Sequence, residues 1–165
     1  MTSSTTAFSV YIFGSTRSAE QVLRVAESQY DRGPLGVDDI AAATWLPGDE
    51  RPATWQEQTL GRRPLSGAFW GMFFGIALLL PLLGSRPRQA HGLLDAVGLS
   101  DELLDQVTRL VLPGTSALFV VSASPPSGRL GVALTRHASN RTDTVLDASQ
   151  TAGLRHAFGA DSRLH

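Results

Sequence analysis

The chain has 165 residues, of which 42% are hydrophobic, and this is enough for one domain with a core. Its net charge is −1, from 14 basic and 15 acidic residues, so it lacks the strong field that binds nucleic acid or an anionic membrane surface. Every basic residue is arginine, and cysteine is absent. This inventory excludes lysine Schiff bases, phosphate-loop lysines, disulfides, thiolate nucleophiles and cysteine metal sites.

The first 60 residues predict a strand, a helix and two further strands. Phe8–Phe13 alternates and is rich in aromatic and β-branched residues, which is typical of a strand. Apolar residues at helical spacing predict a helix over Ala19–Tyr30. Strands are expected at Ile40–Leu46 and at Ala53–Leu60, and the Pro-Gly-Asp run between them favours a hairpin loop.

The dominant feature is an apolar segment in the middle of the chain. Leu65–Leu83 contains 19 residues without a charge, and arginines lie on both sides of it. We expect one helix over residues 64–84. A helix that is apolar on every face has no polar face to expose to water, so it must be buried in protein or in lipid.

The second half predicts further helices and strands. Acidic residues in the first turn favour a helix that starts at Ser100 and ends near Leu110. Thr115–Ser122 is typical of a buried strand. After it we expect a helix at Gly128–His137, an edge strand at Thr144–Leu146 and a last helix at Gln150–Phe158.

This order of elements favours an α+β fold. Strand, helix, strand, strand, helix, strand is the order of a ferredoxin-like antiparallel sheet with helices on one face, and residues 64–84 are then an inserted apolar helix. We expect one domain over residues 8–158, with flexible ends at 1–7 and 159–165.

Three glycines mark one face of the apolar segment. Gly67, Gly71 and Gly75 are four residues apart, so they share a helix face. Each glycine costs about 1 kcal/mol of helix stability relative to alanine, and such spacing lets a second helix approach closely. We therefore expect a homo-oligomer, with the large aromatic residues as packing. The residues assigned to self-association are Gly67, Gly71, Gly75, Phe69, Trp70, Phe73 and Phe74.

Two alternatives use the same segment differently. Residues 65–83 are long enough to span a bilayer. However, Pro81 interrupts the segment, arginines flank both ends, and a single crossing would separate the early strands from Thr115–Ser122. The other alternative is a core helix within one domain.

Three places in the chain resemble one bacterial family. They are Phe8–Gly14 followed by a helix, the run Leu65–Gly75, and the run Leu112–Val121. Together they resemble the family known as domain of unknown function 1269, whose members are often labelled predicted membrane proteins. The resemblance implies an architecture and brings no catalytic residues. The family usually has a second Gly/Ala-rich apolar stretch after the first, and here that stretch is shorter and polar.

No stretch of the chain carries a catalytic or cofactor motif. The four histidines lack partners at metal-binding helical spacing. The acid pairs Asp38-Asp39 and Asp49-Glu50 are expected in solvated turns. Gly14–Arg17 offers backbone amides to an anion but lacks the dinucleotide-binding spacing. Rings that could stack on a ligand are those of Trp45, Trp55, Tyr11 and Tyr30, but most aromatic residues in strands serve packing. We expect no cofactor and no metal.

The functional expectation is therefore a non-catalytic, self-associating structural or interaction protein in the cytoplasm. Its partner is a second copy of itself, and nucleic acid is not expected. One alternative is an inner-membrane-associated protein that contacts lipid through residues 65–83. The other is an α+β protein that binds a small ligand between its sheet and helices.

Overall fold

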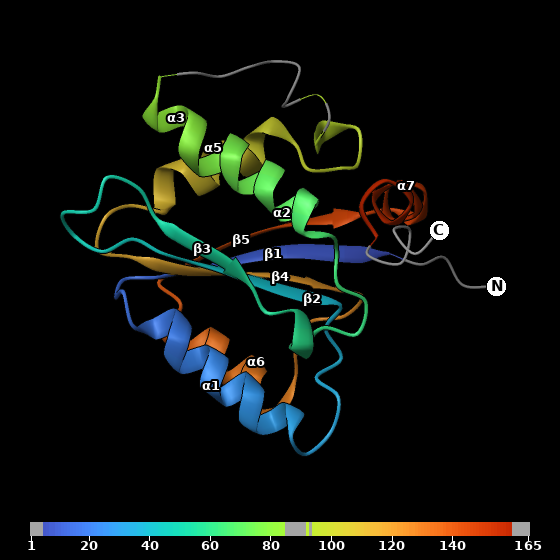
Figure 1. The fold of residues 1–165 in the computed structure, drawn as a ribbon. Helices are drawn as coiled ribbons and strands as arrows, with labels where there is room; N and C mark the ends of the chain where they lie inside the picture. The colour runs from blue at the N-terminus through green and yellow to red at the C-terminus, as the bar shows by residue number, and fades with distance from the viewer. Residues whose placement is uncertain (1–4, 85–91, 93, 160–165) are drawn as a thin grey trace.

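A computed structural model describes residues 5–84, 92 and 94–159. Five strands in these residues form one antiparallel sheet in the order β3-β2-β4-β1-β5 (Figure 1). The strands are β1 (Thr6–Phe13), β2 (Asp39–Thr44), β3 (Ala53–Gln56), β4 (Ser116–Ser122) and β5 (Asn140–Leu146). The α+β class expected from the sequence is confirmed.

Two helices cover one face of the sheet. Helix α1 (Ser18–Tyr30) connects β1 to β2, and α6 (Gly128–His137) connects β4 to β5. They lie side by side below the sheet in Figure 1. Their apolar faces form one core with the sheet, in which Val22 and Leu134 pack with Ile40.

A second helical layer covers the opposite face (Figure 1). It comprises α2 (Gly67–Phe74), a π-helical turn (Gly75–Leu79), α3 (Leu80–Leu82) and α5 (Asp101–Leu110). The last helix, α7 (Ala148–Phe158), lies beside the sheet at the end where β5 finishes.

The prediction of helices on one face is therefore wrong. The physical reason is visible in β1, which is apolar on both sides. Phe8 and Val10 belong to the core under α2 and α5, whereas Tyr11 and Phe13 belong to the core under α1 and α6. A sheet whose strands are apolar on both faces needs cover on both faces.

Several element ends differ from the sequence-based expectation. Strand β1 begins at Thr6, inside the segment expected to be flexible, because Thr6 pairs with Leu146. Strand β3 ends at Gln56, and a 3-10 turn (Gln58–Leu60) follows it. Strand β5 begins at Asn140, four residues before the expected edge strand. The rest of the two segments expected to be flexible, residues 1–4 and 160–165, lies outside the described residues.

The apolar segment is three consecutive helical pieces over 67–82. The π-helical turn precedes Pro81, which has no N–H and cannot continue a regular hydrogen-bond ladder. Across this irregularity the Leu80 N–H donates to the Gly75 carbonyl. The Thr108 hydroxyl of α5 donates to the Ala77 carbonyl at 2.6 Å, which ties the two helices together. None of the helices in the described residues is both long and apolar enough to cross a membrane.

Candidate functional site

The four aromatic residues assigned to self-association face the sheet of their own chain. Phe69, Trp70, Phe73 and Phe74 are buried on the inner side of α2. The ring of Phe73 lies 5.1 Å from that of Phe8, and the ring of Phe74 lies 5.1 Å from that of Phe119. These side chains are the core between α2 and the sheet.

The three glycines face the other way. Gly67 and Gly71 are exposed and Gly75 is half-buried. A Cβ atom added at any of the three would meet no heavy atom within 4 Å. Packing within the described chain therefore does not require glycine at these positions. The predicted site is split into an inward aromatic face and an outward glycine stripe, defined here as Gly67, Gly71 and Gly75.

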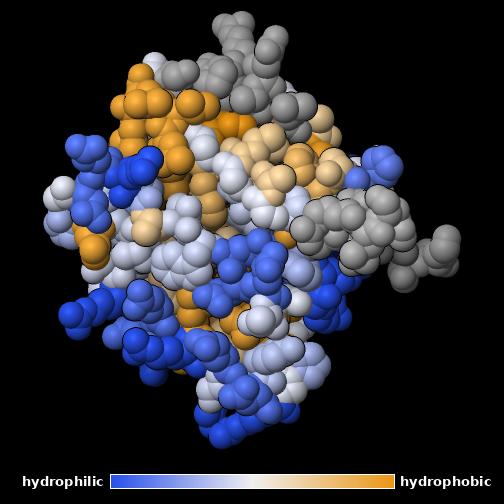
Figure 2. Space-filling view, viewed as in Figure 1, coloured by the Kyte–Doolittle hydropathy of each residue, from blue (hydrophilic) through white to orange (hydrophobic). Residues whose placement is uncertain are grey.

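An apolar surface continues from the same layer. Leu82 is 46% exposed and Leu83 is 79% exposed at the end of α3. Leu79 and Leu80, one turn earlier, are half-buried. We call these four residues the α3 patch. Figure 2 shows hydrophobic surface at the upper left, where α3 lies in Figure 1. Exposed apolar patches of this kind are commonly contact surfaces.

A buried carboxylate fixes the start of α2 on the sheet. Asp39 is 0% exposed, and its Oδ2 accepts hydrogen bonds from Trp70 Nε1 at 2.7 Å and from the Leu65 N–H at 2.9 Å. Gln56 Nε2 donates to the same oxygen at 3.0 Å, and the Ile40 N–H donates to Oδ1 at 2.9 Å. Burial raises the pKa of Asp39, and these four donors oppose that shift.

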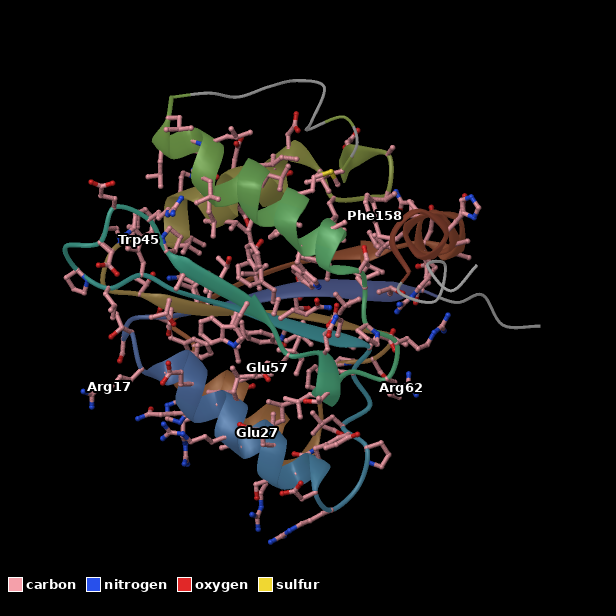
Figure 3. The ribbon with its side chains drawn as sticks, in the orientation of Figure 1. Arg17, Glu27, Trp45, Glu57, Arg62 and Phe158 are labelled. Atoms are coloured by element: carbon pink, nitrogen blue, oxygen red, sulfur yellow. The ribbon has the colours of Figure 1, made fainter. Side chains whose placement is uncertain are left out.

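The neighbouring acid ties two further segments to the same place. Asp38 forms ion pairs with Arg62 at 3.2 Å and with Arg155 of α7 at 3.1 Å. Arg62 comes from the segment just before α2 (Figure 3). Arg155 also donates to the Arg63 carbonyl. Asp38 and Asp39 together therefore join β2, α2 and α7.

The expectation that Asp38-Asp39 lies in a solvated turn is wrong. Both residues are buried, and Asp39 is the first residue of β2. The signal was available in the sequence, because the pair directly precedes the apolar run that starts at Ile40. Asp39 has no open face for a reactant and its oxygens are occupied by donors. Its role is to position α2.

The other candidate residues do not assemble into a site. His137 ends α6 and His156 lies on the exposed side of α7, whereas His91 and His165 lie outside the described residues. In the part of the chain that the structure describes, no three His, Asp or Glu side chains gather closely enough to hold a metal ion. Asp49 and Glu50 are exposed in the β2–β3 loop, as expected.

The fold and the contacts define an α+β protein whose antiparallel sheet carries an apolar helical layer with an outward glycine stripe. The sequence model of the family DUF1269, described as a protein of unknown function, matches residues 64–159. This range covers more than half of the chain, so the protein belongs to the DUF1269 family, as the resemblance implied. The match begins just before α2 and includes β4, β5 and α7. Neither a curated protein nor a solved structure matches the chain.

Proposed function

We propose that this protein is a non-catalytic structural or interaction protein that associates with copies of itself through the glycine stripe of α2. The observation that carries the proposal is the open space outside Gly67, Gly71 and Gly75. Each glycine costs about 1 kcal/mol in a helix relative to alanine, and no contact within the described chain offsets that cost. A close approach by a second helix is a physical reason for three glycines on one face.

The mode of association follows from the placement of the stripe. In a twofold dimer the same surface is used by both copies, so α2 of one copy packs against α2 of the other. Leu82 and Leu83 of the α3 patch extend this surface with apolar area. The four aromatic residues stay in the core of each copy and act indirectly, by holding α2 in place.

The strand order supports a ferredoxin-like body for this assembly. The four strands β2-β4-β1-β5, with α1 and α6 as their connections, correspond to that arrangement, and β3 is an addition at one edge. The segment between β3 and β4 is then an insertion on the open face of the sheet, where it presents the glycine stripe to a partner.

Substitution of Gly71 by leucine tests the proposal. Gly71→Leu places a large side chain in the middle of the stripe, and we expect the oligomer to dissociate while the circular dichroism spectrum stays folded. Gly153→Leu is the matched control, because Gly153 is also in a helix, α7, and also has open space around it. Light scattering after size exclusion measures both. An oligomer unchanged by Gly71→Leu contradicts the proposal.

A second candidate function uses the α3 patch against lipid. The exposure of Leu82 and Leu83 favours it, since apolar side chains at a helix end insert into the interface of a bilayer. Sedimentation with phosphatidylcholine vesicles tests this function. Binding to vesicles that Leu83→Ser abolishes supports it, and a protein that stays in the supernatant contradicts it. If the protein acts by self-association, we expect it in the cytoplasm. If it binds lipid through the α3 patch, we expect it at the inner membrane.

A further inference from the structure

The two edges of the sheet differ in how they are protected from pairing with another strand. At one edge, β3 has four residues, follows directly after Pro52 and is succeeded by the 3-10 turn. At the other edge, β5 has seven residues without proline or glycine, and it pairs with β1 along its whole length in an unbroken register. Shortness, proline and bulges commonly protect an edge strand, and β5 has none of these features.

The backbone along the outer side of β5 is open to a partner. Among the strands that the structure describes, β5 is hydrogen-bonded to β1 alone. Every second residue of such a strand directs its N–H and C=O groups away from its neighbour, so β5 carries a row of donors and acceptors on its outer side. The side chains of Arg141, Asp143 and Val145 are exposed, and that of Val145 is 68% exposed.

The side chains of β5 divide between the two faces of the sheet. Arg141 pairs with Tyr11 and its guanidinium carbon lies 5.1 Å from the centre of that ring, so Arg141 is on the face that α1 and α6 cover. Asp143, two residues further on, shares this face and forms an ion pair with Arg141 at 2.9 Å. Thr142 lies on the opposite face, where its hydroxyl donates to Gln106 of α5.

These two charges favour a second copy of β5 as the partner. When two copies of one strand pair antiparallel about a twofold axis, one residue lies opposite itself, and residues equally far on either side of it lie opposite each other. With Thr142 at the axis, Arg141 of each copy lies opposite Asp143 of the other, on the same face. With Arg141 or Asp143 at the axis, two like charges lie directly opposite, which destabilises a strand pair.

We propose that β5 is an interface at which two copies of this protein pair antiparallel, with the twofold axis at Thr142. The two sheets then form one continuous sheet, and the two Arg141–Asp143 pairs form one cluster of four charges. The inference does not rest on the glycine stripe, which belongs to α2 and not to the sheet edge. A chain that uses both interfaces assembles beyond a dimer, into a closed tetramer or a filament.

Cysteine substitution tests the position of the axis, because the chain has no cysteine of its own. Thr142→Cys places two thiols opposite each other, where the Cα atoms of paired strands are about 4.5–5.5 Å apart and a disulfide can form. Oxidation is expected to give a covalent dimer on a non-reducing gel. Thr144→Cys is the matched control on the same face of β5. Its two copies are displaced by four residues, which is about 13 Å, and should not cross-link.

Thr54→Cys, an exposed position in the other edge strand, measures cross-linking by random collision. Thr142→Cys is expected to cross-link at least about tenfold faster than either control, because thiols held together have a high effective concentration. A rate no higher than that of either control overturns the proposal. The readout is a bond at residue 142, so its failure is distinct from a failure of the glycine stripe, which Gly71→Leu reports.

Two charge variants separate contacts between copies from contacts within one chain. Arg141→Asp leaves two acids on the edge and Asp143→Arg leaves two arginines, so each variant repels its own copy. Both are made in Gly71→Leu, in which the glycine stripe is blocked, and association is measured by analytical ultracentrifugation. Each is expected to dimerise about tenfold more weakly than Gly71→Leu by itself.

An equal mixture of the two charge variants is the decisive sample. Opposite charges again lie across the axis, although the ion pair inside each chain stays broken. The mixture is therefore expected to associate as tightly as Gly71→Leu by itself. Single variants that dimerise at full strength, or a mixture as weak as its components, contradict the proposed interface.

Discussion

Asp39 shows how one side chain determines the placement of a whole layer. Its carboxylate lies at the start of β2 and accepts hydrogen bonds from the Leu65 N–H and the Trp70 indole, which are the first contacts of the apolar layer with the sheet. A buried acid without partners would be strongly destabilising, but four donors surround this one. The glycine stripe faces outward because these bonds and the aromatic core hold the opposite side of α2 inward.

Removal of this carboxylate is expected to destabilise the protein strongly. Asp39→Ala leaves the buried N–H groups of Leu65 and Trp70 without their acceptor, and each unpaired buried donor costs about 1–3 kcal/mol. The free energy of unfolding in urea measures the loss. Asp49→Ala, in the exposed loop, is the control and should change stability by less than about 0.5 kcal/mol. Equal effects of the two substitutions contradict the role given to Asp39.

The raised pKa of Asp39 makes the free energy of unfolding depend on pH. The folded chain keeps the proton to a higher pH than the unfolded chain, in which the ordinary value is 3.8. The unfolding free energy contributed by this group is therefore fully present below that value and decreases as pH rises through the raised folded pKa. Urea unfolding of the protein and of Asp39→Ala from pH 3 upward measures it. The difference between them should shrink over this window, and a growing difference contradicts the direction of the shift.

At the scale of elements, periodicity predicted most helices and strands but not their irregularities. The helix at Gly128–His137 has the expected ends, and β1, α1, β2 and α5 lie where their patterns placed them. The apolar segment is different. Its residues are apolar on every helix face, so their periodicity does not indicate which face contacts the sheet or where the helix is irregular. Pro81 marked an interruption, but the sequence does not reveal that Thr108, far along the chain, supplies a donor to Ala77.

The bond between α5 and the apolar layer is open to a double-mutant test. Thr108→Val removes the donor to the Ala77 carbonyl, and we expect a loss of about 1–3 kcal/mol in unfolding free energy. Pro81→Ala supplies a backbone N–H at the position that bonds to residue 77 in a regular helix. Adding Pro81→Ala to Thr108→Val should therefore recover part of the loss. Strictly additive effects of the two substitutions contradict this coupling.

At the scale of the molecule, the sequence predicted an α+β sheet but placed its helices on one face only. The missed signal is the double apolar pattern of β1, in which Phe8 and Tyr11 face different cores. The sequence predicted one part of the candidate site and not the other. Spacing put Gly67, Gly71 and Gly75 on one face, but only the contacts of Asp39 and the aromatic residues show that this face is the outer one.

The most direct test of the central claim is the molecular mass of the unmodified protein in solution without detergent. The chain has a mass of 17.6 kDa. Size exclusion with light scattering, repeated over a range of concentrations, should give a discrete multiple of this mass that falls toward 17.6 kDa on dilution. A mass of one chain at every concentration would mean that the glycine stripe does not drive self-association.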